Sequence, residues 1–216
     1  RRAAAGLVRV ALDRGWDLDP VGLYAPAMAR FRGQAADLEL GDEEAMDALL
    51  QFTADRLVHH LGQEGVPQDA VRAALAAAPG GLATVAAWAR ALDAHRDDPA
   101  LVRAGTGANR CRRIVAGSDH GLDGYASAGD PHEDALAQAL ERAEQAIRSA
   151  RESGDAPAAI AAAEALAAPV DDFFDAVMVN ADDPRERDRR HALVRRAGEA
   201  YGQVADFAVL VLKGGE

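Results

Sequence analysis

The sequence predicts an all-α fold, a multi-helix bundle made of two packed helical units. Three observations support this prediction. Alanine and leucine, both strong helix formers, dominate the 216 residues. Apolar residues recur at spacings of three and four, which places them on one face of a helix. No segment alternates apolar and polar residues as a half-buried strand does.

Breaking and capping residues set the predicted helix boundaries in the first half of the chain. Asp19 can cap a first turn that contains Pro20, because proline lacks the N–H group that would be unpaired there. Gly15 and the pair Gly80 and Gly81 are expected to end helices. The segments expected to be helical are 3–14, the stretch that follows Asp19, 42–65, 67–79 and 82–92.

In the second half, aspartate–proline pairs mark helix starts at Asp98, Asp130 and Asp183. Glu133 lies three residues after Asp130, as in a capping box. The glycine-rich stretch 117–129 is expected to be a loop excursion between helices. An alanine-rich helix is expected to follow Gly154 and to reach Ala168, where Pro169 bends the chain into a new segment.

Composition limits the possible partners. The net charge of -11 has the wrong sign for binding a polyanion over the whole surface, so any RNA contact must be local. The single cysteine, Cys111, excludes an internal disulfide framework, and no apolar run is long enough for a membrane span. We expect a cytoplasmic protein and, since the chain begins without methionine inside a helical pattern, a fragment of a longer one.

Two arginine clusters are the local exceptions to the acidic charge. The first spans residues 103–113 and holds four arginines and no acid, whereas the second spans 185–196 and holds six arginines and two acids. Guanidinium groups bind phosphate bidentately and stack on unpaired bases, although solvated helix faces also carry such charge. The candidate RNA-binding residues are Arg110, Arg113, Arg185, Arg187, Arg189 and Arg190. For Arg190, a structural ion pair with Asp206 is an equal alternative.

Phe173 and Phe174 are candidates for base stacking. Neighbouring side chains leave a helix about 100° apart, so one ring is expected in the core and the other at its rim. The same stripe places Val177 and Met178 in the core.

Several polar groups could form sites but have structural interpretations. The aspartates near the two phenylalanines could indicate Mg²⁺ binding, but Asp171 and Asp172 suit the first turn of a helix and Asp183 suits a cap. The adjacent His59 and His60 cannot share a helix face, and the other histidines are scattered, so no metal site is predicted. No catalytic constellation is visible.

The stretch 169–210 resembles the C-terminal anticodon-binding region of bacterial glycyl-tRNA synthetase β subunits. The residues that support this resemblance are Pro169, Val170, Asp171, Phe173, Phe174, Asp175, Val177, Met178, Val179, Asp183, Arg187, Arg190, Val204, Ala205, Asp206 and Phe207. Weaker matches upstream extend the resemblance to roughly three quarters of the chain. The sequence departs from the family pattern at Arg113, Asn180, Arg189 and His191.

The resemblance implies a helical body over residues 1–100 and a DALR-type anticodon-binding domain over 101–216, with the loop excursion near 117–129. It implies that tRNA-Gly and the synthetase α subunit are partners, in a heterotetramer or a fused chain, and excludes DNA and membranes. ATP and Mg²⁺ are expected only at the α-subunit catalytic site, with no cofactor, metal or catalytic residue in this chain. The alternative is an acidic assembly module that contacts the α subunit or other β domains and binds little RNA.

Overall fold

A computed structural model describes residues 2–32, 41–122 and 124–212, and every regular element in these ranges is an α-helix. The all-α prediction is confirmed. None of the described helices is both long and apolar enough to cross a membrane. The helices are α1 (Arg2–Arg14), α2 (Pro20–Arg32), α3 (Asp42–Gln63), α4 (Gln68–Ala77), α5 (Leu82–His95), α6 (Pro99–Val115), α7 (Pro131–Ser153), α8 (Ala156–Ala176) and α9 (Pro184–Gly202).

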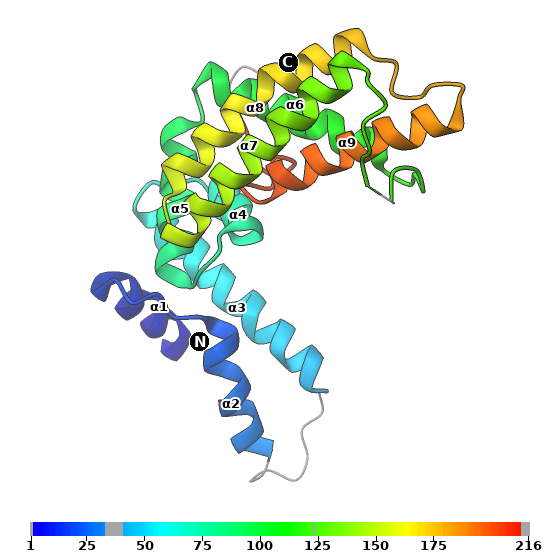
Figure 1. Cartoon of the computed structure of the whole chain (residues 1–216). Coiled ribbons are helices and arrows are strands. Elements are labelled where there is room, and N and C mark those ends of the chain that lie inside the picture. The colour runs from blue at the N-terminus through cyan, green and yellow to red at the C-terminus, as the bar shows by residue number, and fades with distance from the viewer. Residues whose placement is uncertain (1, 33–40, 123, 213–216) are drawn as a thin grey trace.

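The helices form a bundle with an arm (Figure 1). Helices α6 to α9 pack together at one end, α4 and α5 lie beside them, and α1 to α3 extend away as the arm. A single apolar core runs from Val8 in α1 to Leu210 after α9. Because this core continues across residue 100, the division of the chain at that point stays a prediction.

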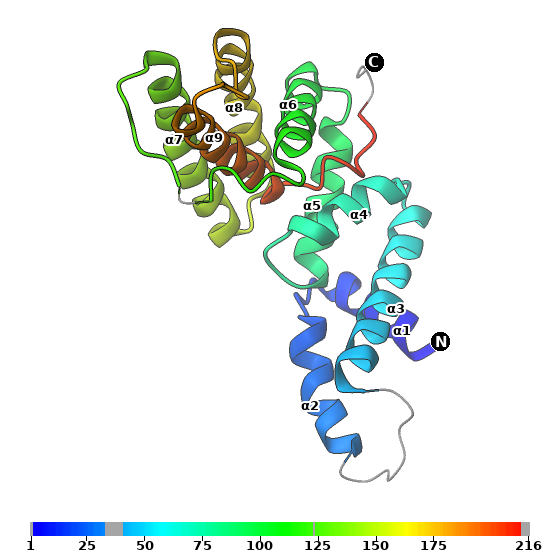
Figure 2. The same ribbon diagram turned by 90° about the vertical axis from the view of Figure 1, so that its right-hand side faces the viewer.

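The segment after α9 connects the bundle to α4 and α5. It passes between α6 and these two helices, as Figure 2 shows in red. Trp88 of α5, fully buried, donates its indole N–H to the Val204 carbonyl at 2.7 Å. Asn109 of α6 donates to the Phe207 carbonyl at 3.0 Å, and Asp206 N–H donates to the Ala73 carbonyl of α4. These bonds fix the position of residues 204–207 against α4, α5 and α6.

Most predicted helix starts are confirmed. Asp19, Asp130 and Asp183 each accept backbone N–H bonds from the first turn that follows them. Asp98 precedes α6 as predicted but makes no such bond with its side chain. The capping box at Asp130 is incomplete, because Glu133 turns into the protein and bonds arginines of α9 instead.

The predicted helix end at Ala168, before Pro169, is wrong. Helix α8 continues through this proline to Ala176, so no new helix begins there. Burial of the helix along most of its length outweighs the one hydrogen bond that proline removes. Asp171 and Asp172 therefore lie near the helix end, and the first-turn explanation for them is wrong. Asp171 instead pairs with Arg103 of α6 at 2.5 Å.

Two glycines allow close packing around α6. Gly105 and Gly107 are buried within an unbroken helix. A Cβ at Gly107 would lie 3.4 Å from the Tyr201 hydroxyl of α9, and one at Gly105 would lie 2.4 Å from Leu212 Cδ1. The small residues therefore let α9 and the final segment approach α6 closely from two different sides.

Candidate nucleic-acid interface

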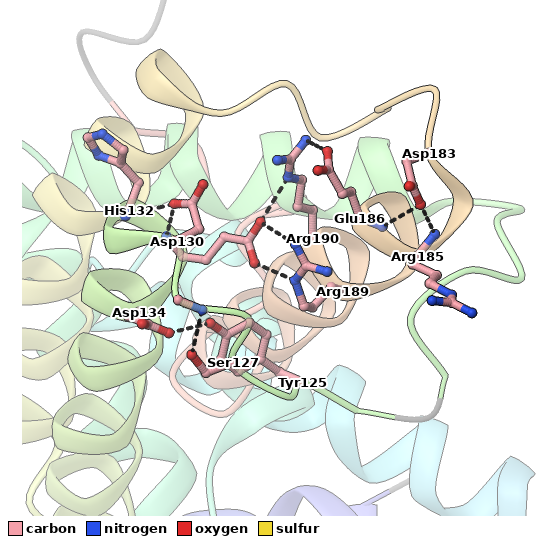
Figure 3. A network of polar contacts seen from close by, with 12 residues as sticks. Tyr125, Ser127, Asp130, His132, Asp134, Asp183, Arg185, Glu186, Arg189 and Arg190 are labelled. Atoms are coloured by element: carbon pink, nitrogen blue, oxygen red, sulfur yellow. Dashed lines mark hydrogen bonds and ion pairs between the residues drawn. The ribbon is translucent and has the colours of Figure 1, made fainter.

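Two arginines of the second cluster are bound to one buried carboxylate. Arg189 Nε lies 2.7 Å from Glu133 Oε2 and Arg190 Nε lies 2.9 Å from Oε1 (Figure 3). Glu133 is 0% exposed, and its hydrogen bond raises the pKa of the Arg189 guanidinium. Arg190 also donates to the Met178 carbonyl and pairs with Glu186. These contacts join α9 to the start of α7, so both arginines form part of the scaffold.

The predicted partner of Arg190 was wrong. Asp206 lies beyond the other end of α9, where its carboxylate accepts the Ala208 N–H at 2.9 Å. Arg190 is near the start of the same helix and reaches Glu133. Sequence spacing along a helix could not reveal this carboxylate, because α7 brings it from a distant part of the chain.

The other arginines of the second cluster are also largely engaged. Arg195 donates to the carbonyls of Ser118 and His120, and Arg196 pairs with Glu144. Arg187 is half-buried, with an Nε that has no hydrogen-bond partner among the described residues. Arg185 is exposed and points away from the Glu133 network (Figure 3). Of this cluster, Arg185 remains the most accessible to a ligand.

The first cluster presents a different arrangement on α6. Arg110, Arg112 and Arg113 are all exposed. Arg112 bonds the Asn109 side chain at 3.2 Å, and Arg113 bonds the Asn109 carbonyl at 3.3 Å. Within the described ranges, neither Arg112 nor Arg113 forms an ion pair with a carboxylate. Their positive charge is therefore available to a phosphate.

Arg112 and Arg113 border a groove between α6 and the segment after α9. Two adjoining hollows of about 460 and 440 Å³ share Asn109, Arg112, Phe207 and Ala208. We call these two hollows the α6 groove. Arg113 lines its second hollow, whereas the acidic Glu199 and Asp206 line the first. Apolar walls beside guanidinium groups suit an unpaired base and its phosphate.

Sequence reasoning selected Arg113, which lines this groove, but missed Arg112 and residues 205–212. Arg110, which it also selected, does not line the groove and lies over the Phe174 ring instead. Arg112 belongs to the same arginine cluster as Arg113, and this clustering was the signal that could have identified it. The contribution of the final segment depends on tertiary packing and had no local signal.

The two phenylalanines are both buried. Phe173 is 1% exposed and Phe174 is 8% exposed, and their rings meet edge to face at 5.7 Å. Arg110 covers a face of Phe174 at 4.0 Å from the ring centre. The expected difference in burial is wrong, and neither ring offers a free face for a base. Met178, expected in the core, is 74% exposed because α8 ends before it.

A buried histidine holds the 117–122 loop against α9. His191 is 2% exposed, with Nε2 2.9 Å from Asn180 Oδ1 and Nδ1 3.1 Å from Ser118 Oγ. Asn180 and His191 are two of the positions at which the sequence departs from the family pattern. Here they bond each other, so the two departures are structurally linked.

Acid should weaken the fold through His191. Burial lowers the pKa of His191 below its usual 6.5, and the charges of His120, Arg195 and Arg187 lower it further, against a smaller opposing effect of Asp188. The folded state therefore binds fewer protons than the unfolded state in mild acid, and stability falls as pH drops below about 6.5. We expect denaturation midpoints to fall from about pH 7 to 5, and less steeply in His191→Gln. Equal slopes would contradict this assignment.

Two further groups have simple structural explanations. Cys111 is buried, which raises the pKa of its thiol to about 12 and leaves it unreactive. The aspartates near the phenylalanines do not gather into one site, because Asp171 pairs with Arg103 and Asp183 caps α9.

A separate cluster of His95, Asp98 and Glu164 lies where α5, α6 and α8 meet.

Comparison with known proteins identifies relatives for nearly the whole chain. Residues 108–202 match the family model of the DALR anticodon binding domain. Over 97% of its length the chain is 34% identical to the glycine–tRNA ligase beta subunit of Janthinobacterium sp. (strain Marseille). It is 30% identical, over the same share, to that of Ectopseudomonas mendocina (strain ymp). The chain spans 29% and 30% of these two relatives.

Proposed function

Because the chain is related to the glycine–tRNA ligase beta subunits and contains a DALR anticodon binding domain, we propose that it holds tRNA-Gly by the anticodon arm. The contact surface in this proposal is the α6 groove. The observation that supports it is the exposure of Arg112 and Arg113 without carboxylate partners among the described residues, whereas Arg189 and Arg190 are paired with Glu133.

The proposed mechanism is positional. Arg112 and Arg113 hold backbone phosphates and fix the orientation of the arm, while unpaired anticodon bases enter the groove and provide identity. The acidic remainder of the surface, at a net charge of -11, repels RNA elsewhere and favours this one contact. In the cytoplasmic holoenzyme, the α subunit would handle ATP, Mg²⁺ and glycine activation. Correct docking of the acceptor end would then raise kcat.

The expected binding of tRNA-Gly is weak and depends strongly on salt. For about four phosphate contacts, log K should fall with log salt at a slope of roughly -3. A fluorescence anisotropy titration at several salt concentrations measures this slope, with a tRNA-Gly of altered anticodon as the control. We expect the altered tRNA to bind less tightly at each salt concentration, because the bases in the groove differ. A flat salt response, or no preference for the native anticodon, would contradict the proposal.

A second candidate function, an assembly module, is favoured by the arm. Helix α2 has no buried residue and exposes Val21, Leu23 and Phe31, and Trp16 before it is also exposed. Such apolar surface is typical of a protein contact. Co-purification with the α subunit or the remaining β-subunit domains, lost in a Trp16→Ser and Phe31→Ser variant, would support this function. Under this candidate alone, the chain would bind little RNA.

A further inference from the structure

Three potential metal ligands meet at a junction of helices that lies outside the α6 groove. His95 ends α5, Asp98 immediately precedes α6, and Glu164 lies in the middle of α8. His95 Nδ1 is 3.6 Å from Asp98 Oδ2 and 3.9 Å from Glu164 Oε1. The three ligand atoms all lie within 4.8 Å of one another.

One carboxylate oxygen of the cluster lacks the polar partner that its burial demands. Glu164 Oε1 is completely buried and has no hydrogen-bond partner among the described residues, although a buried carboxylate oxygen is normally bonded. The 3.9 Å separation from His95 is too long for a hydrogen bond. Burial raises the pKa of Glu164, and the nearby Asp98 carboxylate raises it further. Two carboxylates therefore face a single imidazole, an arrangement that an added cation would stabilise.

Asp98 contributes to the cluster from the start of α6. It occupies the N-cap position of α6, yet its carboxylate accepts no bond from the first turn. Asp130, Asp155 and Asp183 hold the equivalent positions before α7, α8 and α9 and do accept such bonds. The Asp98 carboxylate is directed toward His95 instead.

From this geometry we propose that His95, Asp98 and Glu164 bind one divalent transition-metal ion of the zinc class. A mixed set of imidazole nitrogen and carboxylate oxygens suits zinc better than Mg²⁺ or Ca²⁺, which take oxygen ligands. Ligand atoms around a tetrahedral zinc ion lie about 3.5 Å apart, so small side-chain shifts would complete the site. Asp98 is exposed, which leaves room for water as the fourth ligand.

The bound ion would join the region before the anticodon domain to that domain. His95 and Asp98 precede the matched range 108–202, and Glu164 lies inside it. The ion would hold the start of α6 against α8 and so stabilise the helix that bears the groove. Spacing in the sequence could not predict this site, because Glu164 is far along the chain from His95 and Asp98.

Zinc titration of the metal-stripped chain tests this proposal. Isothermal calorimetry should detect one Zn²⁺ per chain, and the melting temperature should rise with free Zn²⁺. Glu164→Gln and Asp98→Asn keep the side-chain shapes and should each weaken Zn²⁺ binding at least tenfold. His95→Ala should abolish it. The control is His59→Ala, which removes an exposed histidine outside the cluster and should leave binding unchanged.

The variants are first compared by circular dichroism, so that a loss of binding is separated from a loss of fold. Glu164→Gln remains informative if His95→Ala does not fold. Absence of saturable Zn²⁺ binding would overturn the proposal and leave His95 as an ion-pair partner only. Stoichiometric binding that survives in Glu164→Gln and His95→Ala would also overturn it, because the ion would then lie elsewhere.

Discussion

The Glu133→Gln variant is expected to lose a large part of the free energy of unfolding. Glu133 is fully buried and accepts bonds from both Arg189 and Arg190. Glutamine keeps the shape of the side chain but removes the negative charge, which leaves Arg189 without its ion-pair partner and Arg190 with Glu186 alone. Breaking a buried ion pair on one side typically costs about 3–5 kcal/mol. Urea denaturation followed by circular dichroism measures the change in midpoint.

Glu144→Gln is the matched control for this substitution. It removes the carboxylate that pairs with Arg196 between the same two helices, but both groups are partly exposed. Solvent screens such a pair, so the expected loss is about 1 kcal/mol or less. If the two variants unfold alike, the Glu133 network does not hold α7 and α9 together.

Phe173→Ala and Phe174→Ala are both expected to destabilise the bundle strongly. Each ring is buried between helices, and removal of a buried phenylalanine side chain typically costs about 3–5 kcal/mol. Phe174→Ala also removes the contact with the Arg110 guanidinium, worth about 0.5–1 kcal/mol at an exposed position. Thermal unfolding measures both losses.

Met178→Ala is the control for the phenylalanine variants, because its side chain is exposed just beyond the same helix. The expected change is within about 0.5 kcal/mol. A Phe174→Ala variant that melts like the parent and binds tRNA-Gly weakly would contradict the burial of this ring and would restore the stacking hypothesis.

Local signals predicted the helices well. The aspartate–proline pairs that begin at Asp19, Asp130 and Asp183 start helices as expected. A side-chain cap and a proline in the first turn stabilise a helix start through contacts within a few residues, so the sequence alone reveals them. The same local reasoning failed at Pro169. There the packing of α8 decided the outcome, and this packing depends on residues from other helices.

The binding surface was harder to predict than the fold. Clusters of arginine are visible in the sequence, but the carboxylate that pairs with both Arg189 and Arg190 comes from the start of α7. Whether a guanidinium is free or engaged is a tertiary property, so the two clusters could not be ranked. The structure ranks them by contacts, with Arg112 and Arg113 unpaired among the described residues.

The central claim, that the α6 groove is the RNA contact, is tested most directly by one paired comparison. The affinity for tRNA-Gly is measured across a salt series for Arg112→Gln/Arg113→Gln and for Arg142→Gln/Arg148→Gln. The second pair removes the same charge from exposed positions on α7. The α6 variant should bind at least about tenfold more weakly, with a salt slope shallower by about 2, and the α7 variant should bind like the parent. Equal losses in the two variants, or unchanged binding by the α6 variant, would contradict the claim.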